Sequence, residues 1–316
     1  MIFSKCSLRI SLAGGSTDLQ EFVDSNGYGT VISFPCNLYT YISLFHDRNG
    51  LNNFSKKYII NYRRREETDS PNEIKNDIAK EVINYFGCGP LNMCFFADVF
   101  SEGSGLASSS SYLLACIKAV VQYQNIPISD HEICNIALQI ERNFNPLTGY
   151  QDIYGCGISG FKKINFSKEK KGVKIKIDHL PPEFLKCFDM YLIYTGVKRK
   201  STNLLKTLDL NKVEKILPLV NFMESSIRNN DFDSFFSIIN EGWAKKKETS
   251  SEIMSNPIIQ ELDGRLSNDP SVLAHKLCGA GGGGYFLVFK KKYSILNLDS
   301  LIKINLSDRA ITCKTI

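Results

Sequence analysis

The sequence has little of what marks a membrane protein, an exported protein or a zinc protein. None of its apolar runs is long enough to cross a bilayer. Its first residues lack the long apolar core and the small-residue cleavage site of a signal peptide. The ten cysteines form no C-x-x-C pair and have no histidine companions at zinc-binding spacing. We therefore expect no membrane span, and we expect reduced thiols in a cytoplasmic protein.

A strong charge of one sign is also absent. The 38 lysines and arginines oppose 33 aspartates and glutamates, which leaves a net charge of +5. The basic residues gather in short clusters that are typical of solvated faces, and no recognition helix or RNA-binding signature accompanies them. Only four histidines are present, far apart in the sequence. The mild positive charge by itself suits phosphorylated small molecules as well as nucleic acid. Without a nucleic-acid-binding signature or a membrane span, we predict no nucleic-acid partner and no membrane partner.

The composition, 43% hydrophobic and 22% charged, is that of a globular protein. At 316 residues the chain exceeds one ordinary domain, and its pattern changes near residue 180, so we predict two domains, 1–180 and 181–316. Segments 49–57 and 66–72 are expected to be a turn and a loop. Apolar periodicity predicts helices at 74–86, 112–123, 129–143, 213–227, 231–239 and 258–266. It predicts strands at 6–12, 30–45 (two strands, broken at Pro35), 58–62, 91–99, 173–177, 190–194 and 285–289.

A glycine- and serine-rich stretch at 103–111 leads directly into the helix expected at 112–123. Glycine lets a backbone approach a ligand closely, and the first amides of a helix are unpaired donors at the positive end of its dipole. The pattern favours a phosphate site, with serine hydroxyls as further donors or as oxygen ligands of Mg²⁺. A Ser/Gly linker is the alternative, although a linker would not continue without a break into an apolar helix.

A single carboxylate stands near the end of the next expected helix. Ser129 and Glu132 have the spacing of a capping box, which would start this helix. Glu141 would then lie close to the C-terminus of the helix, where a negative charge opposes the helix dipole. We expect a positive charge to compensate this carboxylate, and Arg142, a lysine or a metal ion are the candidates.

Three glycine-rich tracts, at 13–18, 103–111 and 279–284, follow one another along the chain, with Glu141 and Asp152 between the second and the third. Their order and spacing resemble the three signature motifs of the GHMP small-molecule kinase superfamily, which has no Walker A pattern. Within this superfamily the chain is most similar to the branch of D-glycero-D-manno-heptose 7-phosphate kinase and its fucokinase-like relatives. The likeness to that branch rests on segments 8–18, 140–142, 151–161, 194–196 and 242–256.

The resemblance implies an α+β, two-lobed GHMP kinase fold. The N-terminal lobe would be ribosomal-S5-domain-2-like, the C-terminal lobe ferredoxin-like, and the active site would lie in the cleft between them. The resemblance also implies ATP and Mg²⁺ as cofactors and a sugar or sugar phosphate as the small-molecule substrate. It leaves a homodimer open.

The resemblance further implies roles for individual residues. Asp152 would receive the proton of the sugar hydroxyl with Arg9 beside it, and Ser109 and Glu141 would hold Mg²⁺. The residues expected to wrap the ATP phosphates are Gly103, Ser104, Gly105, Leu106, Ala107, Ser108, Ser109 and Ser110. The residues expected to contact the substrate are Asp18, Gly15, Ser16, Thr17, Gly281, Gly282, Lys198 and Arg199. The last two are candidates for a substrate phosphate, with a solvated basic run as the alternative. Ser16 and Ala107 stand where the family usually has glycine.

The expected activity is transfer of the γ-phosphoryl group of ATP to the anomeric hydroxyl of D-glycero-D-manno-heptose 7-phosphate. The product would be the 1,7-bisphosphate, used for nucleotide-heptose and surface polysaccharide synthesis. A kinase for an unphosphorylated sugar of the fucose or galactose type is the first alternative. The second is a non-catalytic sugar-binding relative, and the retention of Ser109, Glu141 and Asp152 argues against it.

Overall fold

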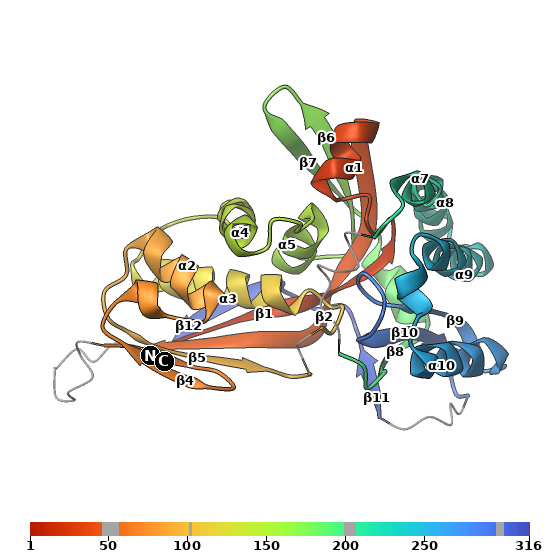
Figure 1. The fold of residues 1–316 in the computed structure, drawn as a ribbon. Coiled ribbons are helices and arrows are strands. Elements are labelled where there is room, and N and C mark those ends of the chain that lie inside the picture. Colours follow the sequence, from red (N-terminus) through yellow and green to blue (C-terminus); the bar gives the residue numbers. More distant parts are fainter. Residues whose placement is uncertain (46–56, 101–102, 199–206, 295–299) are drawn as a thin grey trace.

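The computed structural model describes residues 1–45, 57–100, 103–198, 207–294 and 300–316. They form two lobes, each built on a mainly antiparallel sheet (Figure 1). The first sheet contains β1 (Ile2–Ala13), β2 (Tyr28–Phe45), β3 (Tyr58–Asn61), β4 (Arg65–Thr68), β5 (Asn92–Ala97), β6 (Lys162–Glu169), β7 (Gly172–His179) and β12 (Ile311–Thr315). Its order is β12-β1-β2-β5-β3-β4, with the β6–β7 hairpin attached to β2. The second sheet, in the order β11-β8-β10-β9, contains β8 (Asp189–Tyr194), β9 (Val272–Leu277), β10 (Tyr285–Lys290) and β11 (Leu301–Ile304).

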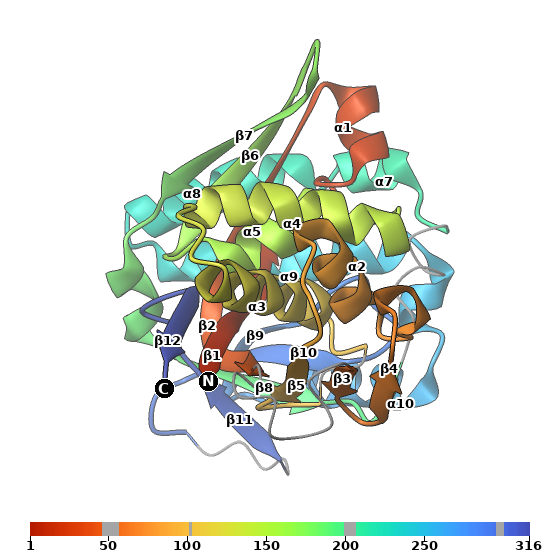
Figure 2. The same cartoon turned by 90° about the vertical axis from the view of Figure 1, so that its left-hand side faces the viewer.

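Helices cover both sheets. In the first lobe, α3 (Ser108–Tyr123) and α5 (Tyr150–Gly157) pack on β1 and β2, and α2 (Asp77–Phe86) and α4 (Asp130–Phe144) pack against α3 (Figure 2). A short helix, α1 (Gln20–Asn26), contacts β2 and β6. The second lobe contains α7 (Leu210–Glu214), α8 (Leu217–Arg228), α9 (Phe232–Glu248) and α10 (Pro257–Asn268). No helix within the described ranges combines the length and the apolar character that crossing a membrane requires.

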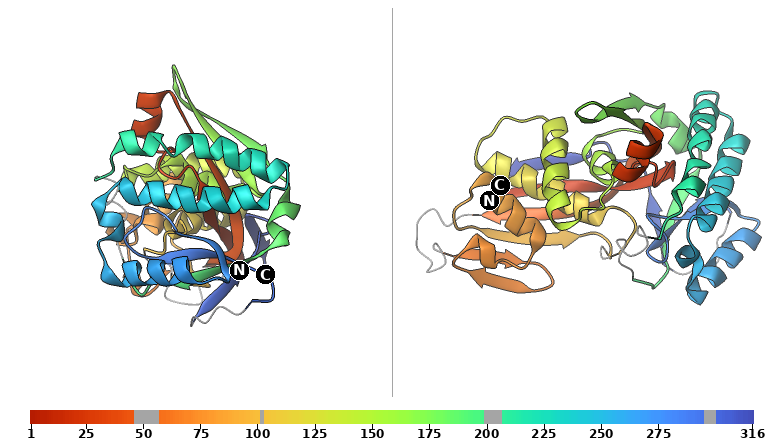
Figure 3. Two further views of the ribbon diagram at one scale, coloured as in Figure 1. Left: turned by 90° about the vertical axis from the view of Figure 1, so that its right-hand side faces the viewer. Right: turned by 45° about the horizontal axis from the view of Figure 1, so that its top comes forward.

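A shared apolar core joins the two lobes. Figure 3 shows the long strands β1 and β2 running from the first lobe to the helices of the second. Leu8, Ile10 and Phe34 of these strands belong to one buried cluster with Phe235 of α9 and Phe289 of β10. Because burying apolar surface is the main stabilising contribution to folding, this cluster holds the two lobes against each other.

The chain ends in the lobe where it begins. Strand β12 pairs antiparallel with β1, and the Ile316 amide donates a hydrogen bond to the Met1 carbonyl at 2.8 Å. The last strand therefore returns to the first sheet after the second lobe is complete. The domain boundary near residue 180 stays a prediction. Strand β12 follows that boundary in the sequence and yet belongs to the first sheet.

Strand β2 corrects the prediction of two strands broken at Pro35. It runs without interruption through Pro35, which pairs with Arg9 next to a register shift in the β1–β2 ladder. A β-bulge tolerates a residue that cannot donate to the ladder. The Pro35 carbonyl still accepts a hydrogen bond from the Ser307 amide, at 2.8 Å. The missing N–H therefore does not end the strand.

Other segments also differ from their predictions; α9, for example, runs to Glu248, beyond the expected end at 239. The turn expected at 49–57 lies, except for Lys57, outside the described residues. Part of the loop expected at 66–72 forms β4, which pairs with β3. The single helix expected at 213–227 is two helices, α7 and α8. Pro218 lies in the first turn of α8, where a backbone N–H would have no partner within the helix. A helix that continued from α7 through Pro218 would lose a hydrogen bond at this position. Helix α5 was not predicted, since its glycines lower the helical signal.

Candidate active site

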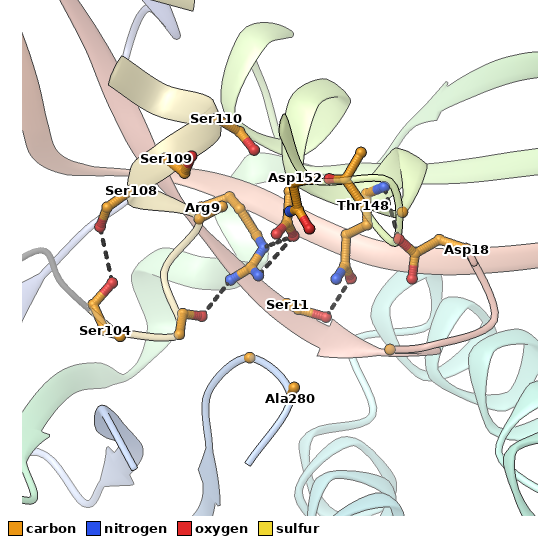
Figure 4. A pocket seen from close by; sticks show the side chains of 18 of the residues that line it. Arg9, Ser11, Asp18, Ser104, Ser108, Ser109, Ser110, Thr148, Asp152 and Ala280 are labelled. Atoms are coloured by element: carbon orange, nitrogen blue, oxygen red, sulfur yellow. Dashed lines mark hydrogen bonds and ion pairs between the residues drawn. The ribbon is translucent and has the colours of Figure 1, made fainter. Parts of the chain in front are cut away.

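A cavity of about 780 Å³ lies where the two lobes meet. Its walls come from the end of β1 and the turn after it, the serine loop at 103–107, and the first turns of α3 and α5. The second lobe contributes faces of α8 and α9, Lys276 of β9 and the Gly279–Ala280 turn. Figure 4 shows the Ala280 turn facing Arg9 and the serine loop across this space.

The serine loop is tightly folded against the second lobe. Gly103 and Gly105 have φ values of 67° and 76°, in the left-handed region that favours glycine. A Cβ on Gly105 would lie 2.5 Å from the Cys278 carbonyl oxygen, so only glycine fits at this approach. The hydroxyls of Ser104 and Ser108 lie 2.8 Å apart and fasten the loop to the helix.

Helix α3 begins at Ser108, four residues before the predicted start, so the serines form its first turn. The first amides of a helix have no partner within it, and here they lie at the cavity. These amides belong to a helix and not to a flexible linker, and they could bind an anion there; the phosphate site itself stays a prediction.

Two residues of the cavity wall have a left-handed backbone without being glycine. Ser16 has φ 76° and Ala107 has φ 62°, and both line the cavity. These are the two positions where the family usually carries glycine. The left-handed backbone is therefore preserved, at a cost of about 1 kcal/mol for each side chain.

Arg9 and Asp152 form an ion pair at the centre of the cavity. Arg9 Nη2 and Nε donate to Asp152 Oδ1 at 2.8 and 3.1 Å, and Nη1 donates to the Gly105 carbonyl at 2.6 Å. The Arg9 side chain is 3% exposed and that of Asp152 is 35% exposed. Burial lowers the pKa of Arg9, but the Asp152 carboxylate, together with Cys156 and Cys278, outweighs this, and the net pKa is raised. A permanently charged arginine thus orients a carboxylate that remains open to the cavity.

Asp18 lies beside this pair at the end of the first glycine turn. Its Oδ2 accepts the backbone N–H of Gln151 at 2.9 Å, and the side-chain oxygen of Gln151 accepts a hydrogen bond from the Ser11 hydroxyl at 2.6 Å. Burial, and then the negative charge of Asp152, raise the pKa of Asp18 to about 6. A Cβ on Gly149 would lie 2.0 Å from Asp18 Oδ2, so the carboxylate occupies space that only glycine leaves open.

Glu141 is buried behind the first turn of α3, 108–111, which we call the serine turn. Its Oε2 accepts a hydrogen bond from the Ser110 hydroxyl at 2.7 Å. Burial raises its pKa to about 8. The suggestion that Arg142 compensates this carboxylate is wrong. Arg142 donates to the Gln20 side chain at 3.1 Å and lies 4.9 Å from the centre of the Tyr150 ring.

The surroundings of Glu141 fit a magnesium ion. No basic side chain in the described ranges forms an ion pair with Glu141, although it is a buried acid beside the serine turn. Exposed Ser109 lies on the same turn. No group of three or more histidine, cysteine or acidic side chains gathers in the described part of the chain. Mg²⁺ suits such a site, because it takes one or two carboxylates and completes its shell with phosphate oxygens and water.

Some predicted residues lie outside the cavity wall. Thr17 donates its hydroxyl to the Gly14 and Thr30 carbonyls, and Leu106 is buried in the shared core. Gly281 and Gly282 pack against Ile253, while their neighbours Gly279 and Ala280 line the cavity. Lys198 is exposed, with its Nζ 4.4 Å from the centre of the Phe100 ring. Arg199 lies outside the described residues.

The structure also adds residues that the sequence analysis did not assign to the site. Ser11, Gln151, Lys246 and Lys276 all line the cavity. An apolar and aromatic wall is formed by Ile78, Phe95, Phe96, Phe100 and Tyr112. In the sequence, Ile238, Gly242 and Lys246 stand four residues apart. This spacing could have indicated that Lys246 shares one helix face with the other two.

Comparison with known proteins agrees with this geometry. Residues 72–160 match the family model of the GHMP kinases N terminal domain. The chain is 28% identical over 321 residues to D-glycero-alpha-D-manno-heptose 7-phosphate kinase of Campylobacter jejuni, covering 93% of this chain and 92% of that protein. It is 27% identical over 242 residues to L-fucokinase/L-fucose-1-P guanylyltransferase of Bacteroides fragilis, covering 72% of this chain and 25% of that protein.

The fold is also that of a solved kinase. A D-glycero-D-manno-heptose 1-phosphate kinase from Bacteroides thetaiotaomicron superposes with a TM-score of 0.78 at 20% identity, covering 100% of this chain and 99% of that chain. The two-lobed α+β architecture, the serine turn at the cavity and these similarities lead to one conclusion. Residues 72–160 match the GHMP kinases N terminal domain, and the chain is a phosphotransferase similar to sugar kinases that share this domain.

Proposed function

We propose that this protein transfers the γ-phosphoryl group of ATP to the anomeric hydroxyl of D-glycero-D-manno-heptose 7-phosphate. The 1,7-bisphosphate would serve nucleotide-heptose and surface polysaccharide synthesis. The observation that carries the proposal is the Arg9–Asp152 pair, which lies in one cavity with Asp18 and the serine turn. The similarity to the Campylobacter jejuni enzyme over nearly the whole chain supports the choice of acceptor.

The serine turn carries groups that can bind the phosphates of ATP. The amides of 108–110 and the hydroxyls of Ser104 and Ser108 can bind phosphate oxygens, and Ser109 with Glu141 would hold Mg²⁺. When bound, Mg²⁺-ATP supplies a phosphoryl group whose negative charge is partly neutralised by the metal. The wall of Ile78, Phe95 and Tyr112 is apolar enough to receive the nucleobase.

Asp152 would accept the proton of the sugar hydroxyl, with Arg9 beside it. In the described residues, the Arg9 hydrogen bonds to Asp152 go only to Oδ1, which leaves Oδ2 as the acceptor for the sugar hydroxyl. The proton moves from that hydroxyl to the carboxylate as the new O–P bond forms. A free aspartate has a pKa near 3.9 and is a weak base, so the transfer is useful late in bond formation, when the sugar oxygen has become acidic. Arg9 stabilises the carboxylate and the negative charge that develops nearby.

Asp18 suits recognition of the acceptor. Its carboxylate is held by the Gln151 amide, and it can accept hydrogen bonds from sugar hydroxyls. The Gly279–Ala280 turn closes the cavity from the second lobe. We further propose a cytoplasmic location, which is supported by the ten free cysteines, most of them buried.

A coupled ADP-release assay with Mg²⁺-ATP tests the proposal. D-glycero-D-manno-heptose 7-phosphate should stimulate ADP release more strongly than fucose, galactose or the unphosphorylated heptose. Preference for fucose would favour the alternative that the similarity to the Bacteroides fragilis fucokinase suggests. A panel in which no acceptor stimulates ADP release would contradict the kinase function and favour a sugar-binding protein.

The variant Gly149→Ala tests the role of Asp18. The added methyl group would lie 2.0 Å from Asp18 Oδ2, so the carboxylate has to move. We expect the KM for the acceptor to rise about tenfold or more, with the KM for ATP unchanged, because displaced binding groups lose their alignment. Gly264→Ala in α10 is the matched control, since no atom lies within 4 Å of its added methyl. An acceptor KM equal in the two variants would contradict this role.

A further inference from the structure

Two lysines of the second lobe line the same cavity as Asp18 and Asp152. Lys276 is on β9 and Lys246 on α9. Lys246 follows Gly242 and Ile238 at intervals of four residues, and all three line the cavity, so one face of α9 forms its wall. Neither lysine takes part in the proposed transfer of the phosphoryl group or of the proton.

Lys276 is a buried cation at the acceptor side. It is 8% exposed, and its Nζ donates to the Leu12 carbonyl at 2.9 Å. Leu12 lies just before the glycine turn that ends at Asp18. No carboxylate of the described residues lies within ion-pair distance of Lys276. Burial lowers its pKa to about 8, so most of the amine is protonated at neutral pH. A buried ammonium without a counter-charge is costly, and an anion bound in the cavity would compensate it.

A hydrogen-bonded network around Asp263 orients both lysines toward the cavity. Asp263 of α10 accepts hydrogen bonds from Trp243 Nε1 at 2.7 Å and from Lys247 Nζ at 3.0 Å, and lies 2.9 Å from His275 Nε2. Successive residues of a strand point to opposite faces. Because His275 points to Asp263, Lys276 points away from it, toward the first lobe.

The same network sets the rotation of α9. Trp243 and Lys247, four residues apart, face Asp263 and so fix this helix about its axis. Lys246 then lies beside the Gly279–Ala280 turn, where its Nζ donates to the Gly279 carbonyl. Arg9, the third cation at this side of the cavity, is already bound to Asp152.

We propose that Lys276 and Lys246 form the binding site for the phosphate that the acceptor sugar already carries, and that they select sugar phosphates over unphosphorylated sugars. This inference rests on the proposed kinase function and names the residues behind its substrate class. It replaces Lys198, which is exposed and outside the cavity wall. Ammonium groups bind phosphate oxygens through charge-assisted hydrogen bonds, which are stronger than neutral ones.

The test uses the full-length variants Lys276→Met and Lys246→Met, which keep side-chain length and remove the charge. Three constants are measured: the KM for D-glycero-D-manno-heptose 7-phosphate, the KM for ATP and the inhibition constant of the unphosphorylated heptose as competitor. We expect the first to rise about 10- to 100-fold in each variant, because a hydrogen-bonded charge is lost. The other two should change less than about threefold. Lys290→Met is the matched control, since Lys290 is a 7% exposed lysine on β10 that is not part of the cavity wall.

The outcomes separate the two proposals. If the wild type phosphorylates no sugar phosphate, the proposed function fails, whatever the variants do. If the wild type does so and both variants keep its KM for the sugar phosphate, the phosphate site is refuted. If Lys276→Met weakens the phosphorylated and the unphosphorylated sugar equally, its lysine only supports the Leu12 carbonyl, and the inference is overturned. Should Lys276→Met not fold, Lys246→Met decides by the same criteria.

Discussion

The Asp152→Asn variant is expected to lose about a thousandfold in kcat, within the range typical for removing a general base. Its KM for ATP should stay within about twofold. The amide oxygen of asparagine can still accept the Arg9 hydrogen bonds that now reach Oδ1 at 2.8 and 3.1 Å, so the geometry of the site is preserved. The amide cannot take the proton of the sugar hydroxyl, and only the chemical step should suffer.

Steady-state ADP release at saturating ATP and acceptor measures this effect. Asp189→Asn is the control, because Asp189 also forms an ion pair, with Lys303 at 2.8 Å, but lies on the second sheet outside the cavity wall. The control should keep a normal rate. A near-normal kcat in Asp152→Asn would remove Asp152 as the base.

The Glu141→Gln variant should lower kcat by at least about 100-fold and yet stabilise the ligand-free protein above neutral pH. The loss of rate follows from losing a metal ligand whose contribution is several kcal/mol. The gain in stability follows from burial, which raises the pKa of Glu141 from 4.5 to about 8. The folded state then holds a proton that the unfolded state has released, so wild-type stability falls as the pH rises through this interval. Asp18, with a pKa of about 6, acts in the same direction.

Thermal unfolding between pH 5 and pH 8, without nucleotide, measures this second effect. The wild-type Tm should fall with pH more steeply than the Tm of Glu141→Gln. Glu224→Gln is the control: its bonds to Lys163 and Arg228 outweigh its burial and lower the pKa of Glu224, so this carboxyl is ionised in both states above pH 5. Its substitution should lower the Tm and leave the pH slope of this interval unchanged. Identical pH slopes in the wild type and Glu141→Gln would show that Glu141 does not titrate in this interval.

Local features of this protein were readable from its sequence. The capping box is present, with the Ser129 amide 2.7 Å from Glu132 Oε2 and the Glu132 amide 3.2 Å from the Ser129 hydroxyl. The order of the three glycine tracts indicated the family correctly. The capping box rests on interactions among residues close in sequence, where backbone geometry leaves few alternatives.

Other features depended on contacts that local patterns do not encode. Pro35 looked like a strand end, and only the bulge opposite β1 makes it tolerable. Segment 65–68 became a strand because β3 offered it a partner. In both cases the partner strand, and not the propensity of the segment, decided the outcome.

The candidate active site, too, depends partly on local sequence and partly on contacts between distant segments. The sequence by itself determined the family, the serine turn and the choice of Arg9, Asp18, Glu141 and Asp152, because these stand in or beside recognisable motifs. Only the tertiary structure decided that Arg9 bonds Asp152, 143 positions further along the chain, and that Lys276, not Lys198, lines the cavity. The physical reason is that the direction of a side chain on a strand depends on register and twist, and these are set by the packing of distant segments.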